Sequence, residues 1–335
     1  MSLFSRVFNK PAQVSLVREG QTFFLRFFYD NHAATYAEVR EKWQELGALD
    51  RFIDDFRQNS AAIKLSAVDS LKAVMRELRN QYASQNKLNF YISADVEAAL
   101  MGETAPDGFA VKYIREEMIN RGIKASFALG GITAHMVKLH EEGLIERLID
   151  VQSFDKVAAE SIMRDPLHKG VSANEYASAD EPGAATKYLD IVILSALEVD
   201  VNFNVNVLVG SDGIIRGAIG GHPDTAADAA LSIIVCPLLR GRIPCIVDEV
   251  TTLITPGSTV DVVVTEYGIA VNPRRPEIAQ RLQAAGLKIV KLYELRDKAK
   301  SIIGTPDPLP FGDKVVGVVM NRDGSVMDVI KNIVE

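Results

Sequence analysis

The chain has 335 residues, a formal net charge of −7 and a hydrophobic content of 47%, as expected for a globular protein of one large or two smaller domains. The negative charge argues against a nucleic-acid partner, because nucleic-acid binding depends on cations that neutralise phosphates. No apolar run is long enough to cross a membrane, the N-terminus lacks the apolar core of a secretory signal, and Cys236 and Cys245 are expected to be buried free thiols. We therefore expect a cytoplasmic protein without a metal site.

Residues 1–88 have a different pattern from the rest of the chain. Over residues 34–83, apolar residues recur at three- and four-residue spacing, which predicts a helical hairpin or a small helical bundle. The aromatic segment Gln21–Tyr29 is predicted to be a strand or a docking face. We expect residues 1–88 to form a helical N-terminal segment and residues 89–335 to form the main domain.

In residues 89–335, short apolar runs alternate with helical patterns, which predicts an α/β domain with a mainly parallel sheet and flanking helices. The expected strands are Phe90–Ile92, Ser126–Leu129, Leu148–Val151, Ile191–Ser195, Val205–Val209, Ile214–Ala218, Leu231–Val235, Cys245–Val247, Val260–Thr265, Lys288–Val290 and Val315–Met320. The expected helices are Gly108–Arg121, Thr133–Glu142, Lys156–Arg164, Asp224–Ala230, Pro276–Ala285 and Tyr293–Ile302. Asp-Gly pairs at 212–213 and 323–324 predict two antiparallel hairpins.

The most informative stretch is residues 190–225, where an apolar strand is followed by closely spaced carboxylates and amides. Ligands of open α/β sheets bind at the carboxyl edge, and unpaired polar groups buried there would cost roughly 1–3 kcal/mol each. Glu198 is therefore a candidate general acid, general base or acyl acceptor, and Asn204 and Asn206 are candidate substrate ligands. A salt-bridged structural carboxylate is the alternative for Glu198.

Two glycine pairs each follow a strand and open a predicted helix. Gly130-Gly131 and Gly220-Gly221 would let the backbone approach an anion closely, or would simply make tight turns. His222 follows the second pair, and Asp224 or Thr225 is placed to cap the next helix.

Further polar residues follow the ends of two other predicted strands. Gln152 and Ser153 would lie at the sheet edge, and the alternative is that Ser153 or Asp155 caps the next helix. Asn272 and Arg274 follow Val260–Thr265 and would bring a cation to a phosphate, as would Arg240 and Arg242. Surface arginines at a helix end are the alternative.

Four stretches together carry a family resemblance. They are SFALGGITAHMVKLHEEGLIERLIDVQSFD, LDIVILSALEVDVNFNVNVLVGSDGIIRGAIGGHPDTA, LLRGRIPCIVDEVTTLITPGSTVDVVVTEYGIAVNPRRPE and NRDGSVMDVI. Through them the chain from about Gly108 to Glu335 resembles the citrate lyase alpha subunit, the citrate CoA-transferase component. The resemblance implies a CoA-transferase-like fold of the NagB/RpiA type, with two α/β halves around the active site, of which residues 89–335 would be the second.

The resemblance also implies a reaction and its partners. Proteins of this family exchange the acetyl group of an acyl-carrier thioester for citrate, in cytoplasmic citrate fermentation, within a complex that includes a beta subunit and an acyl carrier subunit. Acetyl-CoA, citrate and the phosphoribosyl-dephospho-CoA arm of the carrier would be substrates, an oligomer is expected, and no tightly bound cofactor or metal is expected in this chain.

The expected roles follow from the same resemblance. Related CoA-transferases that form a glutamyl thioester carry Glu near the position of Gln152, and an amide cannot form the acyl anhydride, so direct transfer is implied. The catalytic candidates are Gln152, Glu198, Gly220, Gly221 and His222, with the two glycines at the oxyanion. The candidates for binding substrate or CoA are Gly130, Gly131, Ser153, Asn204, Asn206, Asp224, Asn272 and Arg274.

Residues 1–88 do not resemble the first half of the family. We therefore expect that half to come from a partner or a second copy, or the chain to be a fused or truncated form with reduced activity. Two other functions stay open. One is a non-catalytic scaffold or binding subunit that retains half of the site, and the other is an acyl-CoA hydrolase that uses water as the acceptor.

Overall fold

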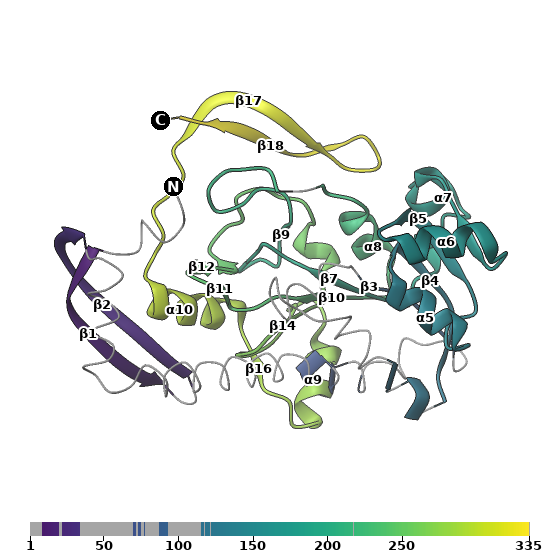
Figure 1. The fold of residues 1–335 in the computed structure, drawn as a ribbon, viewed down its shortest axis with the longest axis horizontal. Coiled ribbons are helices and arrows are strands. Elements are labelled where there is room, and N and C mark those ends of the chain that lie inside the picture. Colours follow the sequence, from purple (N-terminus) through teal and green to yellow (C-terminus); the bar gives the residue numbers. More distant parts are fainter. Residues whose placement is uncertain are drawn as a thin grey trace. The chain divides into compact units, whose positions relative to one another are not determined.

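Figure 1 shows the fold as a computed structural model of the chain. The structure describes residues 9–19, 22–33, 70–71, 73–74, 77, 87–92, 115–116, 118–120, 122–216 and 218–334. The chain divides into two compact units, Met1–Ser66 and Ala67–Glu335. The domain boundary expected after residue 88 stays a prediction.

The described part of the first unit is an antiparallel hairpin of strands β1 (Asn9–Glu19) and β2 (Thr22–Ala33). Valine, leucine and aromatic residues are frequent in these strands, and such residues favour strands. Most of the Gln21–Tyr29 segment therefore lies in β2, in agreement with the strand expected there. We had expected residues 1–88 to be helical, but the described residues before Ala34 form strands. The helices predicted over residues 34–83 lie outside the described residues, except for five helical positions between 70 and 77.

A nine-stranded sheet forms the centre of the second unit, in the order β16-β15-β14-β10-β7-β3-β4-β5-β6. Its strands are β3 (Lys87–Ile92), β4 (Lys124–Ile132), β5 (Leu148–Ser153), β6 (His168–Gly170), β7 (Ile191–Ser195), β10 (Leu231–Val235), β14 (Val262–Thr265), β15 (Gly268–Val271) and β16 (Ile289–Val290). Every neighbouring pair is parallel except β14 and β15. The expected mainly parallel α/β sheet is confirmed.

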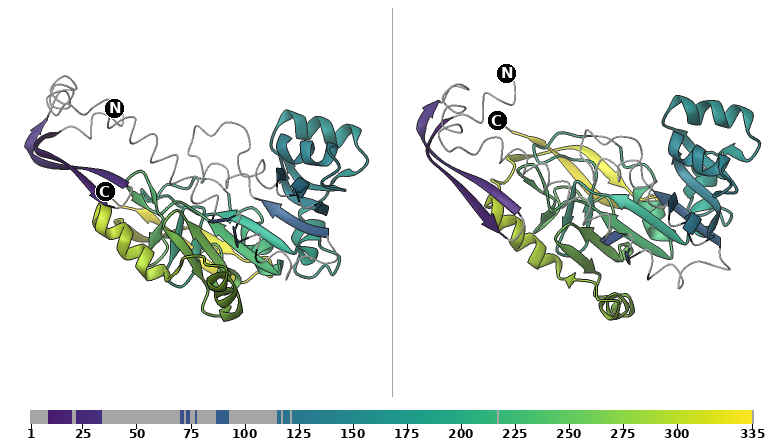
Figure 2. Two further views of the ribbon diagram at one scale, coloured as in Figure 1. Left: turned by 90° about the horizontal axis from the view of Figure 1, so that it is seen from below. Right: turned by 60° about the horizontal axis from the view of Figure 1, so that its bottom comes forward.

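Helices and smaller sheets surround this sheet. The helices are α5 (Ala134–Glu141), α6 (Lys156–Arg164), α7 (Ala173–Ala177), α8 (His222–Asp228), α9 (Pro276–Ala284) and α10 (Leu292–Ile303), with short 3-10 turns η2 (Ala185–Tyr188) and η3 (Gly257–Thr259). The smaller strands are β8 (Glu198–Asp200), β9 (Val205–Asn206), β11 (Leu239–Arg240), β12 (Ile243–Pro244), β13 (Ile246–Val247), β17 (Phe311–Met320) and β18 (Val326–Ile333). Figure 2 shows α10 at one end of the sheet and the group of α5 and α6 at the other.

The central strands are buried on both faces, which explains their unbroken apolar sequences. On one face, Ile191 and Ile193 belong to a core that includes residues of α5, α6 and α9. On the other face, Val192 and Leu194 pack with residues of β8, β9, β13 and α10. The segment after β7 therefore turns back over the second face of the sheet and carries Glu198 with it.

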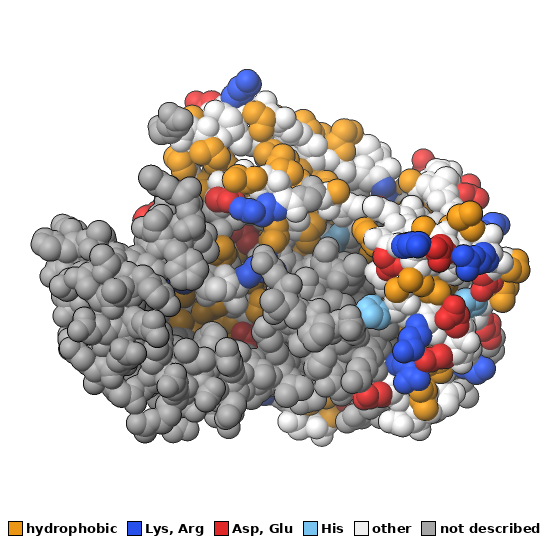
Figure 3. Space-filling view, viewed as in Figure 1, with side chains coloured by type: hydrophobic (Ala, Val, Ile, Leu, Met, Phe, Trp, Pro, Cys, Tyr) orange, Lys and Arg blue, Asp and Glu red, His pale blue; other side chains and the backbone are white. Residues whose placement is uncertain are grey.

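The C-terminal hairpin of β17 and β18 turns at Asp323-Gly324, as predicted, and Gly324 takes the left-handed conformation with φ of 82°. Its inner face packs on the rest of the unit, because Val319 and Ile330 are buried with Leu208 and Ile254. Its outer face carries exposed apolar side chains, which Figure 3 shows gathered over the hairpin at the top of the view.

The strands predicted at Val205–Val209 and Ile214–Ala218 are much shorter than expected. The structure has only the two-residue β9 and an isolated antiparallel bridge between Val209 and Ile215. The side chain of Asn206 explains the early end, because its Oδ1 accepts hydrogen bonds from the main-chain N–H groups of Leu208 and Val209. Those two amides are therefore not available to a strand ladder.

The predicted helix over Gly108–Arg121 is helical at its described positions, which are 115, 116 and 118–120. Within the described residues, no helix is both long and apolar enough to span a membrane.

Candidate functional site

Several of the predicted site residues lie at one edge of the sheet. Gly131 pairs with Gln152 in the parallel ladder of β4 and β5, so these residues end their strands side by side. Asn272 and Arg274 follow β15, which runs antiparallel to β14, and the structure therefore places them at the opposite edge. The sequence predicted that all site residues line one edge of the sheet. This prediction is wrong for Asn272 and Arg274. Asn272 instead donates to the main-chain oxygens of Gly257 and Val260.

The carboxylate of Glu198 is enclosed in a complete hydrogen-bond network. Its Oε2 accepts from Asn206 Nδ2 at 2.8 Å and from the Thr251 main-chain N–H at 2.7 Å, and its Oε1 accepts from Thr251 Oγ1 at 2.9 Å. Glu198 is 7% exposed and Asn206 is fully buried. These contacts pair the side-chain groups of Glu198 and Asn206 internally, which favours a structural role for both residues.

Asn204 also belongs to an internal network. Its Nδ2 donates to Asp200 at 3.0 Å, and its Oδ1 accepts from the main-chain N–H of Gly257 at 2.9 Å. Asp200 accepts two further main-chain hydrogen bonds, from Asn202 and Asn204. This arrangement fixes the turn between β8 and β9, where Phe203 has a φ of 68°. The side-chain amide of Asn204, a predicted substrate ligand, therefore stabilises a tight turn.

His222 connects the start of α8 to the end of β7. Its Nε2 lies 2.9 Å from the main-chain oxygen of Ser195, which can only accept, so Nε2 carries the proton and Nδ1 accepts from Thr255 Oγ1 at 2.7 Å. Burial lowers the pKa of His222 to about 4, although the hydrogen bond to Ser195 opposes this shift. A neutral imidazole with both nitrogens engaged positions the preceding glycine pair at the sheet edge.

The Gly220-Gly221 turn is covered by Tyr176, a residue of α7 that the sequence analysis did not single out. Gly220 has a φ of 54°, and a Cβ at Gly221 would overlap the hydroxyl and ring of Tyr176. Both glycines are therefore required, the first by its backbone conformation and the second by the closeness of the tyrosine.

Asp224 is the third residue of α8, within one turn of this glycine pair. The N-cap is Gly221 and has no side-chain cap, so the expected capping role of Asp224 or Thr225 is wrong. Burial raises the pKa of its carboxyl to about 6, although the guanidinium of Arg322 opposes the shift. The negative charge of Asp224 adds to burial in raising the pKa of Tyr176. At neutral pH Asp224 is mostly ionised, and near pH 6 about half of it holds a proton.

Gly130 and Gly131 lie within the end of strand β4, with an irregular register against β5, so the tight turn expected at this pair is wrong. The pair is nevertheless covered by aromatic rings in a similar way. A Cβ at Gly130, whose φ is 104°, would overlap the ring of Tyr91, and a Cβ at Gly131 would overlap the ring of Phe154. Tyr91 packs against the hydrophobic cluster that contains Tyr176, so these two tyrosines connect the two glycine pairs. The structure therefore brings together the two glycine pairs that the sequence proposed as separate sites.

The residues at the end of β5 differ in their exposure. Gln152 is exposed, and no hydrogen bond joins its side chain to another of the described residues. Ser153 donates to Asp150, which is buried and also lies 3.2 Å from His168 Nε2, and His168 Nδ1 lies 2.9 Å from Ser161 Oγ. Gln152 is thus available to a ligand, whereas Ser153 is part of an internal network.

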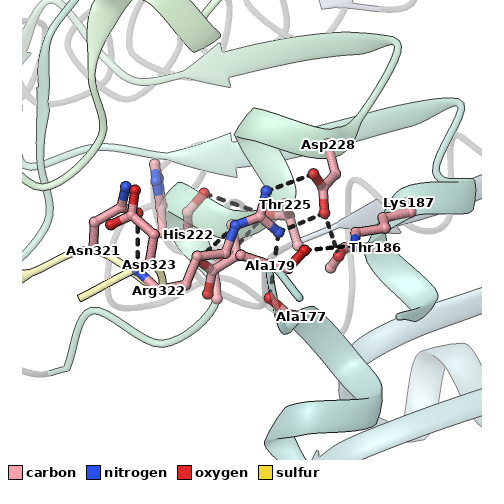
Figure 4. Close-up of polar contacts among 12 residues, drawn as sticks. Ala177, Ala179, Thr186, Lys187, His222, Thr225, Asp228, Asn321, Arg322 and Asp323 are labelled. Atoms are coloured by element: carbon pink, nitrogen blue, oxygen red, sulfur yellow. Dashed lines mark hydrogen bonds and ion pairs between the residues drawn. The ribbon is translucent and has the colours of Figure 1, made fainter. Parts of the chain in front are cut away.

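Arg322, at the tip of the C-terminal hairpin, joins three elements around the Gly220-Gly221 turn (Figure 4). Its Nη1 and Nη2 each lie 2.6 Å from an oxygen of Asp228 in α8, and its Nη1 donates to the main-chain oxygen of Ala177 in α7 at 3.3 Å. Thr186 in η2 also donates to Asp228, at 2.6 Å. A bidentate pair of this kind fixes orientation as well as distance, so α7 and α8 are held in one arrangement.

Arg240 contributes a cation near the end of β7. Its Nη2 donates to the main-chain oxygen of Ala196 at 2.9 Å, and its side chain makes no ion pair with the described residues. Arg274 is exposed at the opposite edge. Arg240 is thus the better placed of these two arginines for an anion at the carboxyl edge.

Tyr176, Arg322 and Asp228 are the residues that the sequence analysis missed. Tyr176 lies in a five-residue helix without a periodic pattern, and Arg322 is 94 residues away from Asp228. The NRDG turn was visible as a hairpin signal, but a turn signal does not identify the partner of the arginine within it.

The part of the chain that the structure describes contains no cluster of three or more His, Cys, Asp and Glu side chains suited to a metal ion. Cys236 and Cys245 are free and buried, as expected, and burial raises the pKa of Cys245 to about 12, so it is a protonated thiol at neutral pH. The groups that the described site does present are two glycine pairs, tyrosine hydroxyls, one partly buried carboxyl and arginines.

Comparisons with known proteins give a consistent result. The family model described as citrate lyase, alpha subunit (CitF), matches residues 99–333. The citrate lyase alpha chain of Escherichia coli (strain K12) is 58% identical over 224 residues, which are 67% of this chain and 44% of that one. The alpha chain of Klebsiella pneumoniae is 42% identical over 307 residues, which are 91% of this chain and 59% of that one.

A solved structure also matches. It is the alpha subunit of citrate lyase from Streptococcus mutans in complex with citrate, with 44% identity, a TM-score of 0.72, and coverage of 81% of this chain and 51% of that one. The Klebsiella alignment extends into residues 1–88, where the sequence analysis saw no resemblance. This chain spans about half the length of the curated relatives it matches. The match of the family model over residues 99–333 shows that the chain belongs to the citrate lyase alpha subunit family.

Proposed function

We propose that this chain is a citrate CoA-transferase component of citrate lyase. It would exchange the acetyl group of a thioester, carried by CoA or by the phosphoribosyl-dephospho-CoA arm of an acyl carrier protein, for a citryl group. Family membership supports the reaction class, and the citrate in the Streptococcus mutans structure supports the acceptor. The observation that carries the proposal is that two glycine pairs, one at the end of β4 and one before α8, are covered by Tyr91 and Tyr176 of one hydrophobic cluster.

The exchange proceeds in two acyl-transfer steps. A carboxylate oxygen of citrate attacks the acetyl carbonyl carbon, the thiolate leaves, and a mixed acetyl–citryl anhydride forms. The thiolate then attacks the citryl carbonyl of the anhydride, and acetate leaves. No enzyme carboxylate takes part, in agreement with Gln152 at the end of β5 and with the fully hydrogen-bonded Glu198. Catalysis then depends on positioning and on donors at the oxyanion.

The proposed roles follow from the geometry. The main-chain N–H groups of Gly220 and Gly221 face the oxyanion, and His222 fixes this turn against Ser195. Gly130 and Gly131 allow the thioester arm to approach the backbone, and Arg240 at the end of β7 binds a carboxylate of citrate. Gln152, which is exposed, contacts the acyl group. Glu198, Asn204 and Asn206 support the site from below through their internal networks.

The proposed partners are a beta subunit that cleaves the citryl thioester and an acyl carrier subunit, in a cytoplasmic complex. Incubation of the chain with acetyl-CoA and ¹³C-labelled citrate, alone and with the other citrate lyase chains, tests the function. Formation of labelled citryl thioester together with acetate supports it. Release of acetate without a labelled thioester would instead identify the chain as a hydrolase, and no reaction of either kind would leave a scaffold role.

A further inference from the structure

Tyr176 presents its hydroxyl to the Gly220-Gly221 turn. The residue is only 5% exposed, and its ring packs with Phe127, Leu129 and Leu189. A Cβ at Gly221 would overlap the hydroxyl oxygen, so this oxygen lies directly against the turn. No other described residue accepts a hydrogen bond from this hydroxyl, and none donates one to it.

Among the described residues, the fully buried side-chain polar atoms without a partner are Asp150 Oδ1 and Ser232 Oγ. The Tyr176 hydroxyl is not one of them, so this oxygen keeps some exposed surface beside the turn while the ring is buried. A tyrosine hydroxyl without a protein acceptor can donate its hydrogen bond to a bound ligand. Burial also raises the pKa of Tyr176 well above 10, so the group stays protonated and can donate a hydrogen bond at any physiological pH.

The hydroxyl is held in place from two sides. The capping box of Ser172 and Glu175 fixes the start of α7, with hydrogen bonds of 2.9 Å and 3.2 Å between them. Arg322 binds the end of α7 at Ala177 and pairs with Asp228 of α8, the helix that follows the glycine turn. A donor fixed in this way needs no reorganisation during a reaction, which is the condition for effective stabilisation of a developing charge.

We propose that Tyr176 is a catalytic residue whose hydroxyl donates a hydrogen bond to the acyl oxygen of a thioester bound against Gly220-Gly221. The inference rests on the proposed function, since the acyl oxygen is that of the exchanged acetyl or citryl group. As the carbonyl carbon becomes tetrahedral, its oxygen gains negative charge, and the hydroxyl and the glycine N–H groups share that charge. The proton stays on the tyrosine throughout, and Arg322 is a positioning residue that acts through α7 and α8.

The first test is the variant Tyr176→Phe in the full chain, because it removes only the hydroxyl and keeps the ring on Gly221. Steady-state exchange between acetyl-CoA and citrate should show a fall in kcat of roughly 100-fold, a KM for either substrate within about twofold, and an unchanged Tm. Tyr293→Phe, in which Tyr293 is 51% exposed on α10, is the matched control and should leave kcat unchanged. A kcat of Tyr176→Phe within about threefold of wild type would overturn the inference.

The second test does not depend on turnover. In protein labelled with ¹³C at the tyrosine Cζ, the signal of Tyr176 is assigned by its loss in Tyr176→Phe. Addition of acetyl-CoA should move this signal and leave that of Tyr293 in place. If the signal moves in a wild-type protein that does not exchange acetyl for citryl on CoA, the proposed function is rejected, but the contact between Tyr176 and the thioester is supported. A signal that stays in place at saturating acetyl-CoA would overturn the contact itself.

Discussion

Two polar clusters follow strand β7, and they differ in how completely their groups are paired. Around Glu198, each carboxylate oxygen accepts hydrogen bonds from Asn206 or Thr251. Around the Gly220-Gly221 turn, the hydroxyl of Tyr176 lacks a partner among the described residues, and burial raises the pKa of Asp224 to about 6. The comparison shows that a dense run of carboxylates and amides in a sequence identifies a buried network. Groups left unpaired identify the better candidate site.

The largest effect is expected for the cluster that is fully paired. Glu198→Ala leaves the N–H and hydroxyl of Thr251 and one N–H of Asn206 without their acceptor, so the free energy of unfolding should fall by roughly 3–5 kcal/mol. Chemical denaturation measures this loss, with the exposed Glu249→Ala as a control that should change little. Equal stability of both variants would show that the network contributes nothing to the fold.

The next effect concerns the clamp beside the second cluster. Arg322→Ala leaves Asp228 partly buried without its bidentate partner, and we expect a loss of about 3 kcal/mol in the free energy of unfolding. Arg322→Lys should recover only part of this loss, because an ammonium cannot reproduce the two parallel hydrogen bonds. Arg164→Ala, at a side chain that is 75% exposed, is the control. A full recovery by lysine would contradict the bidentate geometry.

A smaller, pH-dependent effect is expected for His222. Its pKa of about 4 in the folded state is below the ordinary value of 6.5, so between these pH values the unfolded chain binds a proton at this residue and the folded chain does not. This residue's contribution to stability therefore rises between pH 4 and pH 6.5 and is constant above. The gain in unfolding free energy from pH 4.5 to pH 7 should be about 2 kcal/mol larger in wild type than in His222→Gln. His135→Gln is the control and should show the same gain as wild type. An equal gain in wild type and in His222→Gln would exclude a buried neutral imidazole at position 222.

The smallest effect has the opposite sign. Burial raises the pKa of Asp224 to about 6, so the folded chain holds a proton that the unfolded chain has lost, and stability falls as pH rises from about 4 to 6. Asp224→Asn removes this penalty. The unfolding free energy of the variant minus that of wild type should therefore be about 1–2 kcal/mol larger at pH 7.5 than at pH 4. The exposed Asp307→Asn should show no such change. A difference that does not vary with pH would mean that Asp224 is well solvated.

Much of the fold was predictable because its central strands are buried on both faces. Ile191–Ser195, Leu231–Val235 and Lys156–Arg164 have the predicted bounds, since continuous β-branched runs and a clear helical period carry their signals locally. Strand β15 was missed because its four residues, Gly268–Val271, lie in a hairpin with β14 that has no Asp-Gly or Asn-Gly turn. Its reversed direction is what moved Asn272 and Arg274 to the other edge.

The site was predictable only in part, for a different reason. Both glycine pairs stand out in the sequence, but the expected position between a strand and a helix is wrong, because Gly130-Gly131 lies within β4 and the strand expected before Gly220-Gly221 is reduced to one bridge at Ile215. The tyrosines that join them come from β3 and α7, and the arginine that holds α7 to α8 comes from the C-terminal hairpin. Pairings over such distances in sequence depend on the tertiary fold, which no local spacing encodes.

The most direct measurement is a crystal structure of the full chain with acetyl-CoA and citrate bound. The account predicts that the acyl oxygen lies within hydrogen-bond distance of the Tyr176 hydroxyl and of a main-chain N–H in the Gly220-Gly221 turn. A thioester bound elsewhere, with the hydroxyl of Tyr176 still facing an empty turn, would contradict it.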